Sequence, residues 1–180
     1  MCGRLIRAFA GVAVACMSFS ARSYGQVLAL STNVVDYVQT GGVNVEASYA
    51  LQRHWSVGAG MKYDGRGHQK QQLYSLGGRF WPWHIYSGWW IGAKMQYQEF
   101  SSAERVTYRT SEGDRFGAGA SAGYSRMLGP HFNIDLGLGF WYGNGVYVRY
   151  SCPSCGGILS RGNQAFFLPN DILLALSYIF

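Results

Sequence analysis

Two closely spaced cysteines are the first residues whose types and spacing could support chemistry. Cys152 and Cys155 lie in the segment "SCPSCGG". A Cys-x-x-Cys pair can be half of a zinc site, a redox pair or a small disulfide loop. Zinc needs four ligands, but no second such pair and no histidine lies in this segment, and a redox pair is expected in a βαβ unit. The pattern favours a structural disulfide, with metal binding and redox chemistry as alternatives, and predicts no cofactor.

A second set of candidate residues consists of charged groups within otherwise apolar or glycine-rich segments. Ions confined in a narrow interior without partners would cost several kcal/mol each. We therefore expect these residues to form a charge network, with exposure to water at a barrel rim as the alternative. The predicted members of the network are Glu46, Lys62, Arg79, Lys94 and Asp135.

The elements that carry these charges follow a two-residue repeat. In "FNIDLGLGFWY", from Phe132 to Tyr142, every second residue is apolar and large. Such alternation indicates a β-strand with one apolar face. Similar segments, including a first one whose parity is ambiguous and could hide a bulge, bring the predicted number of strands to eight, at residues 27–37, 43–49, 55–63, 74–80, 89–97, 116–124, 132–142 and 172–180.

Aromatic residues flank the apolar faces of several predicted strands. Three of the flanking pairs are separated by eight residues, which corresponds to roughly 20 Å of height in a tilted strand. Outer-membrane barrels have an apolar band of about 25 Å between aromatic girdles. We expect the girdle to contain Trp55, Tyr63, Trp89, Tyr97, Phe116, Tyr124, Phe132 and Tyr142.

The fold prediction is therefore an all-β, eight-stranded antiparallel transmembrane β-barrel over residues 26–180, with short periplasmic turns and longer extracellular loops. The expected periplasmic links are "ALQRH", "WPWHIYSG" and "MLGPH". The expected extracellular links are "VQTGG", "DGRGHQKQQ", "SSAERVTYRTSEGD" and a long segment after Tyr142. Eight strands leave an interior that side chains can fill, so no open pore is expected.

Residues 1–25 read as a secretory signal peptide. Arg4 and Arg7 precede an apolar stretch too short to span a bilayer, and small residues follow, with cleavage expected after Gly25 or after Ser23. Lipidation at Cys16 is the alternative. Cleavage after Gly25 would remove three of the 15 basic residues, so the mature chain would carry 12 basic and 9 acidic residues. Because the remaining basic residues are not clustered, we expect no nucleic-acid partner.

Several segments resemble the domain-of-unknown-function family 3575, which comprises small outer-membrane barrel proteins of Gram-negative anaerobes. They are "STNVVDY", "NVEASYALQRHWSV", "GGRFW", "CPSCGG", "GNQAFFLP" and "LLALSYIF". The chain departs from the expected pattern at Asn170 and Asp171, where a Thr-Lys pair is expected. The resemblance implies the location and the architecture, brings no established activity, and suggests an association with fimbriae or other surface appendages.

The chain ends on an alternating apolar strand. This end resembles the C-terminal signal that the barrel-assembly machinery recognises, and its predicted residues are Leu174, Leu176, Tyr178 and Phe180. We therefore expect the assembly machinery, outer-membrane lipid and lipopolysaccharide as partners.

The four histidines are candidates for an enzymatic role, since a barrel enzyme that modifies lipid A needs a histidine near a serine or aspartate. Only His68 falls in a predicted extracellular link, without the serine spacing of a deacylase. We expect a non-enzymatic structural or surface-anchoring barrel. The alternative is an adhesion or recognition barrel that binds ligands through its outer loops, and the lesser alternative is a lipid A-modifying enzyme.

Overall fold

The computed structural model is a closed barrel of eight antiparallel strands, each paired with its neighbours in sequence and the last paired with the first. It describes residues 28–65, 69–103, 110–151 and 157–180. The prediction of an all-β, eight-stranded antiparallel barrel is confirmed. The strands are β1 (Leu28–Asn33), β2 (Val43–Gln52), β3 (Trp55–Asp64), β4 (Gln69–Phe80), β5 (Gly88–Ala103), β6 (Thr110–Met127), β7 (Phe132–Tyr150) and β8 (Ile158–Ile179).

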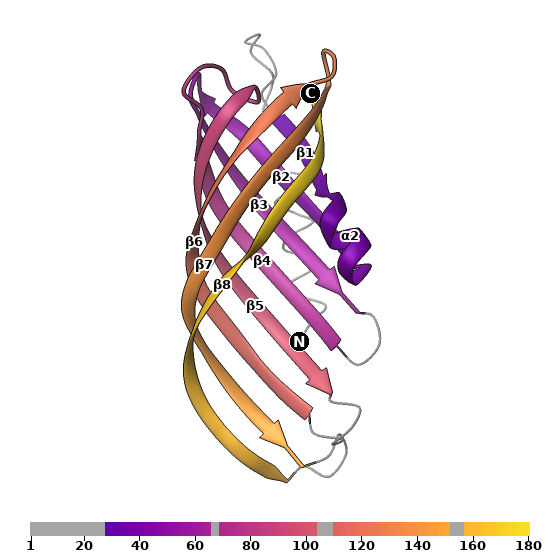
Figure 1. The fold of residues 1–180 in the computed structure, drawn as a ribbon, viewed down its shortest axis with the longest axis vertical. Helices are drawn as coiled ribbons and strands as arrows, with labels where there is room; N and C mark the ends of the chain where they lie inside the picture. Colours follow the sequence, from indigo (N-terminus) through magenta and orange to yellow (C-terminus); the bar gives the residue numbers. More distant parts are fainter. Residues whose placement is uncertain (1–27, 66–68, 104–109, 152–156) are drawn as a thin grey trace.

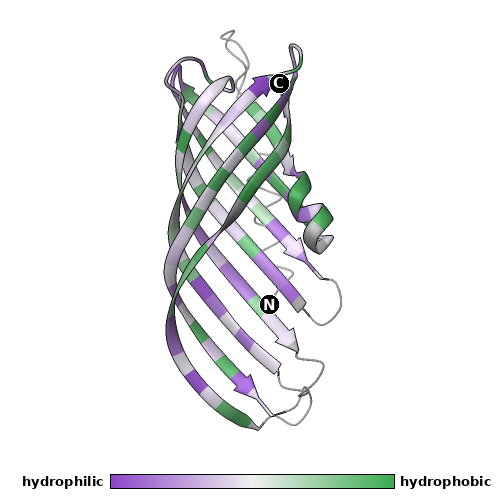
Figure 2. Ribbon diagram, in the orientation of Figure 1, coloured by the Kyte–Doolittle hydropathy of each residue, from purple (hydrophilic) through white to green (hydrophobic). Residues whose placement is uncertain are grey.

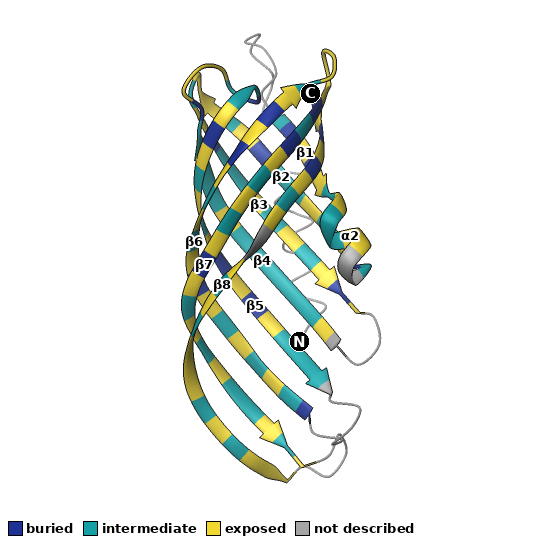
Figure 3. Cartoon of the chain, viewed as in Figure 1, coloured by how far each residue is buried: buried dark blue, intermediate teal, exposed yellow. Residues whose placement is uncertain are grey.

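The two ends of the barrel differ. We call the end that carries the C-terminus and the links 53–54, 81–87 and 128–131 the turn end, and the opposite end the distal end (Figure 1). Hydrophobic residues concentrate in the half nearest the turn end, whereas hydrophilic colours prevail on the distal parts of β5 to β8 (Figure 2). Buried residues also gather near the turn end (Figure 3). The distal half is therefore the more polar and more solvated part.

The first predicted strand is shorter than expected. Residues 27–37 were predicted as one strand, but β1 ends at Asn33 and the helix α2 (Val34–Thr40) follows. The Asn33 side chain caps the helix by accepting a hydrogen bond from Val35 N–H, and Gly41 ends it in the left-handed conformation with φ of 64°. Asp36 lies in the first turn, where a negative charge complements the helix dipole. The capping residue, rather than a bulge, explains the ambiguous alternation of this segment.

The later strands are longer than expected. The segment 101–114 was predicted as a loop, but β5 continues to Ala103 and β6 begins at Thr110. Likewise β7 continues to Tyr150 and β8 begins at Ile158, although a long loop was predicted after Tyr142. The strands β5 to β8 have 16, 18, 19 and 22 residues. Solvated strands carry polar residues on both faces, so their sequences look like loops.

Small residues make room for large ones inside the barrel. Gly137 of β7 faces Trp90 of β5, and a Cβ atom at Gly137 would lie only 2.9 Å from the indole carbon Cζ2 of Trp90. Trp90 is 2% exposed. The glycines that alternate with large outward residues in the sequence thus leave space for a few bulky inward side chains.

Candidate functional site

The eight predicted girdle aromatics are all exposed on the outer face of the barrel. The register arranges them in two rows that run round it. Trp89 lies opposite Tyr124 with ring centroids 5.3 Å apart, and Tyr97 lies opposite Phe116. The row near the turn end contains Trp55, Trp89, Tyr124 and Phe132, and the second row contains Tyr63, Tyr97, Phe116 and Tyr142.

The residues predicted to form the assembly signal lie on the outer face of the end of the chain. Leu174, Leu176, Tyr178 and Phe180 are exposed, whereas Ala175, Ser177 and Ile179 are buried. The Phe180 ring contacts Tyr178 at 4.8 Å, and the Phe180 N–H donates to Leu28 O of β1 at 2.8 Å. The last residue is thus tied to the first strand.

Three of the five predicted interior charges come together. Arg79 of β4 forms an ion pair with Glu46 of β2, with 2.5 Å between Nη2 and Oε1. Its second terminal nitrogen lies 3.8 Å from Oδ2 of Asp135 on β7. The Arg79 guanidinium also lies 4.7 Å from the centre of the Trp90 ring, which is a cation–π distance. One arginine therefore links three strands across the interior.

Asp135 is the most buried of these charges, and hydroxyl and amide groups surround it. Ser125 donates a short hydrogen bond to Oδ1, Ser177 donates to Oδ2 at 3.0 Å, and the amide of Asn133 donates to Oδ1 at 3.2 Å. Hydrogen bonds to both oxygens offset the cost of burying a carboxylate. The alternation in the sequence predicted that Asp135 points inward, but not these partners.

The two lysines of the predicted network differ in position. Lys62 pairs with Asp36 of α2 at 2.6 Å, rather than with Glu46 or Asp135. Sequence reasoning missed Asp36 because this residue was assigned to a strand. Lys94 lines a cavity that Glu46 and Arg79 also line.

That interior cavity is small. Its volume is about 40 Å³, which suits a few water molecules. Trp90 lines it, and the indole Nε1 of Trp90 is buried without a hydrogen-bond partner among the described residues. The mixed polar and glycine lining is suited to water rather than to an apolar ligand.

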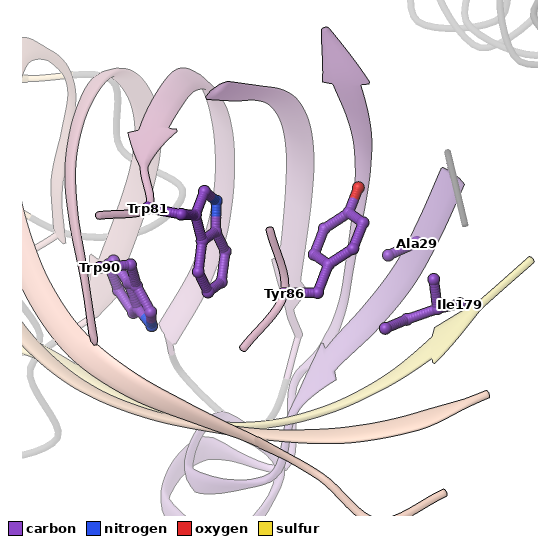
Figure 4. Close-up of a cluster of buried hydrophobic side chains, with 5 residues drawn as sticks. All are labelled: Ala29, Trp81, Tyr86, Trp90 and Ile179. Carbon is purple, nitrogen blue, oxygen red and sulfur yellow. The ribbon is translucent and has the colours of Figure 1, made fainter. Parts of the chain in front are cut away.

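A plug closes the interior at the turn end. The link between β4 and β5 turns inward, so that Trp81 and Tyr86 pack edge to face at 5.8 Å, with Trp90 beside Trp81 at 6.2 Å (Figure 4). Ala29 and Ile179 complete this buried cluster. The sequence segment "WPWHIYSG" was expected to be only a compact turn, and no periodic signal distinguishes its buried aromatic residues from its exposed ones.

Hydrogen bonds hold the plug in place. Trp81 donates from Nε1 to Ser56 Oγ at 3.1 Å, and the Tyr86 hydroxyl donates to Ser48 O at 3.3 Å. The main-chain N–H of Trp81 also donates to His54 O at 2.9 Å. Burial raises the pKa of the Tyr86 phenol above its ordinary value, so this group is a neutral donor at physiological pH.

A polar cluster at the seam between β1 and β8 was not predicted. The Asn33 carboxamide donates to Ile172 O at 3.0 Å and accepts from Leu174 N–H at 3.1 Å, so it continues the ladder after β1 has ended. Asn44 of β2 accepts from Asn33 N–H at 2.6 Å and donates to Asp36 at 2.8 Å. The "TNVVD" part of the sequence thus locks the closure of the barrel.

The candidate cysteines and histidines differ in whether the structure describes them. Cys152, Cys155 and His68 lie outside the described residues, and the described part of the chain contains no group of three or more His, Cys, Asp or Glu that could hold a metal. His54 and His131 lie in links at the turn end, where each Nδ1 is within hydrogen-bond distance of a main-chain oxygen, 2.8 Å from Trp81 O and 3.0 Å from Ile179 O. In the same described residues, no helix has the length and apolar character needed to cross a bilayer.

The described interior groups form a structural core. Carboxylates, hydroxyls and the arginine are engaged with one another, and aromatic rings occupy the turn end of the interior. This arrangement stabilises and fills a barrel. The fold and the interior define the class of protein as a small, closed, eight-stranded antiparallel barrel with a filled interior.

The chain belongs to the family described as "Protein of unknown function (DUF3575)", whose pattern it matches over residues 11–180. The resemblance seen in the sequence is thereby confirmed. A comparison with curated proteins finds no match.

Proposed function

We propose that the chain is a small non-enzymatic outer-membrane β-barrel with a structural or surface-anchoring role. The observation that carries this proposal is the band of exposed apolar side chains on the outside of the barrel. Met61, Leu76, Ile91, Met95 and Leu138 are between 49% and 68% exposed. A barrel dissolved in water would expose a continuous apolar surface of this kind at a large cost, whereas lipid would cover it.

The two aromatic rows support a membrane position for this band. Trp89 and Tyr97 lie eight residues apart on the outer face of β5, which corresponds to roughly 20 Å of height in a tilted strand. That height is close to the apolar band of outer-membrane barrels. The polar distal parts of β5 to β8 would then project beyond the membrane on the extracellular side, with the turn end in the periplasm.

The filled interior favours structure over transport. The plug of Trp81, Tyr86 and Trp90 closes one end, and the ion pair between Arg79 and Glu46 crosses the space behind it. We expect the purified protein to give no steady conductance in a planar bilayer. A large, sustained conductance would contradict a plugged barrel.

The proposed location also determines the expected partners. Export by the signal peptide at residues 1–25 would lead to the barrel-assembly machinery, and the mature barrel would contact outer-membrane lipid and lipopolysaccharide. Fimbrial or other surface components are the partners that an anchoring role would require. Pull-down from crosslinked cells tests whether such components accompany the protein.

A recognition role is the second candidate, and the distal extension of β5 to β8 favours it. These strands pair with one another to the last described residues, with Ala103 opposite Thr110 and Thr110 opposite Tyr150. The extension therefore offers a rigid, solvated surface rather than only loops.

Lipid A modification is the enzymatic alternative. Lipid A mass spectra should be identical in cells with and without the gene if the protein is not such an enzyme.

Cysteine labelling of intact cells tests the proposed position. The background variant carries Cys152→Ser and Cys155→Ser, so that only introduced thiols react. Ser111→Cys on the distal part of β6 should react with a membrane-impermeant maleimide, and Gly129→Cys in the link after β6 should not. A Cβ atom at Gly129 has no neighbour within 4 Å, so the second substitution fits the fold. Labelling of Gly129→Cys alone, or recovery of the protein outside the outer-membrane fraction, would refute the proposal.

A further inference from the structure

The two sides of β8 are paired to very different extents. On one side β8 pairs with β7 from Ile158 to Tyr178. On the other side, within the described part of the chain, it pairs with β1 only from Ala175 to Ile179. We call residues 158–168, which lie beyond this short pairing, the distal edge. Its backbone groups that point away from β7 face no neighbouring strand among the described residues.

The fold covers the side of β8 only near the turn end. Beyond the β1 pairing, the Asn33 carboxamide satisfies Ile172 O and Leu174 N–H, and α2 contacts β8. Pro169, which has no N–H, lies at the irregularity in the β7–β8 pairing. The covered part therefore ends where the distal edge begins.

An uncovered strand edge is a template for a further strand. Unpaired N–H and C=O groups in a row bind an extended chain by main-chain hydrogen bonds, while side chains at alternate positions give specificity. The distal edge also exposes apolar side chains for such contacts, namely Leu159 and Phe167.

The charged residues on the distal parts of β7 and β8 are both positive. Residues 143–169 contain Arg149 and Arg161 and no aspartate or glutamate. Arg161 lies opposite Val148, so these two side chains share one face of the β7–β8 pair. Arg149 follows Val148 in β7 and therefore lies on the other face, so the two arginines lie on opposite faces. An added strand with carboxylates at alternate positions would find a positive charge on whichever face its carboxylates occupy.

We propose that the distal edge binds an extended acidic segment of a partner protein, which adds to β8 as a further strand. The inference rests on the proposed function, because the extracellular position of the distal end gives such a partner access. Main-chain pairing would supply the affinity, and Arg149 and Arg161 would select acidic over basic segments.

One residue allows the edge to be blocked without disturbing the barrel. Leu174, which lies opposite the even-numbered Leu136 of β7, points its N–H toward β1. Because backbone direction alternates along β7, the residues of β8 that lie opposite its even-numbered residues direct their N–H away from β7. Ala165 lies opposite Asn144, so its N–H belongs to the free side. Ala165→Pro removes this donor and no β7 hydrogen bond, and proline is tolerated at such edge positions.

The test uses the purified full chain in detergent and two fluorescein-labelled decapeptides, one alternating valine with glutamate and one alternating valine with lysine. We expect saturable binding of the glutamate peptide by fluorescence anisotropy and slower amide hydrogen exchange in residues 158–168. Arg161→Glu should weaken this binding at least ~10-fold, as expected for the loss of a charge-assisted contact together with repulsion. Ala165→Pro should abolish it.

Several outcomes would overturn the inference. They are equal binding of both peptides, no binding of the glutamate peptide, or unchanged binding of the glutamate peptide by Arg161→Glu. The result for Arg161→Glu decides the matter even if Ala165→Pro does not fold. A dimer that excludes the peptide and dissociates in Ala165→Pro would assign the edge to a second copy instead. Because the assay uses purified protein, its result is separate from the labelling experiment that tests the membrane position.

Discussion

Arg79 and Glu46 form an ion pair across the barrel interior, with 2.5 Å between Nη2 of the arginine and Oε1 of the glutamate. The two residues lie on β4 and β2, which are separated by β3. The pair therefore spans a strand rather than joining direct neighbours. It also places the same guanidinium near the buried Asp135.

Replacing Arg79 should destabilise the barrel. Arg79→Met leaves Glu46 and Asp135 without their cation. Because the pair with Glu46 is only part-buried, the expected cost lies below that of breaking a fully buried pair, which is about 3–5 kcal/mol. The free energy of unfolding in urea and detergent, followed by tryptophan fluorescence, measures this loss. Lys70→Met removes a positive charge from an exposed position and is the matched control. An equal effect of both variants would show that the interior pair contributes nothing specific.

Two tryptophans two residues apart should behave differently. Trp81 is fully buried in the plug, whereas Trp83 is 62% exposed. Trp81→Ala should lower the free energy of unfolding by about 3–5 kcal/mol, because it removes a large buried side chain and leaves Ser56 Oγ without its donor. Trp83→Ala should change it by less than about 0.5 kcal/mol. Similar losses in the two variants would contradict the assignment of the plug.

The number of strands and their faces could be predicted because alternation is a local signal. Trp89 and Tyr97 show on which face they lie from their spacing alone, and the structure places both outside. The inward position of Arg79 and Asp135 follows from the same alternation. Partner choice does not, since the distance between Arg79 and Glu46 depends on barrel closure and strand register.

Three features could not be predicted, each for a physical reason. The helix α2 depends on capping by Asn33, and this cap overrides the strand-like apolar residues that follow Asn33. The distal parts of β5 to β8 carry polar residues on both faces, so composition alone resembles a loop. The burial of Trp81 beside the exposed Trp83 is set by tertiary packing in a non-periodic link.

Asn33, which is half-buried, should prove more important than the exposed asparagines. Asn33→Ala removes the carboxamide that satisfies Ile172 O and Leu174 N–H and caps α2. We expect the free energy of unfolding to fall by about 1–3 kcal/mol, the cost of leaving such groups unsatisfied. Amide hydrogen exchange at Leu174 should also become faster. Asn163→Ala, at an exposed position of β8, is the control and should change neither quantity.

Deletion of Phe180 should impair membrane assembly more than export. Phe180 N–H donates to Leu28 O, and its ring contacts Tyr178, so the deletion removes both a closing hydrogen bond between the first strand and the chain end and the terminal aromatic group. On the proposed outer-membrane location, the unassembled chain should accumulate in the periplasm while signal-peptide cleavage continues. Fractionation and heat-dependent electrophoretic mobility measure the folded, membrane-inserted fraction.

Two further variants separate the contributions of the Phe180 ring and of the chain end. Phe180→Ala keeps the main-chain hydrogen bond to Leu28 and removes only the ring, so an equally severe defect would assign the role to the aromatic group. Phe132→Ala removes an exposed ring that also packs on Tyr178, at 5.3 Å, but is not terminal. If Phe132→Ala impaired assembly as strongly as the deletion did, general loss of outward aromatic packing would explain the defect. Normal assembly of the deletion variant would refute the terminal signal altogether.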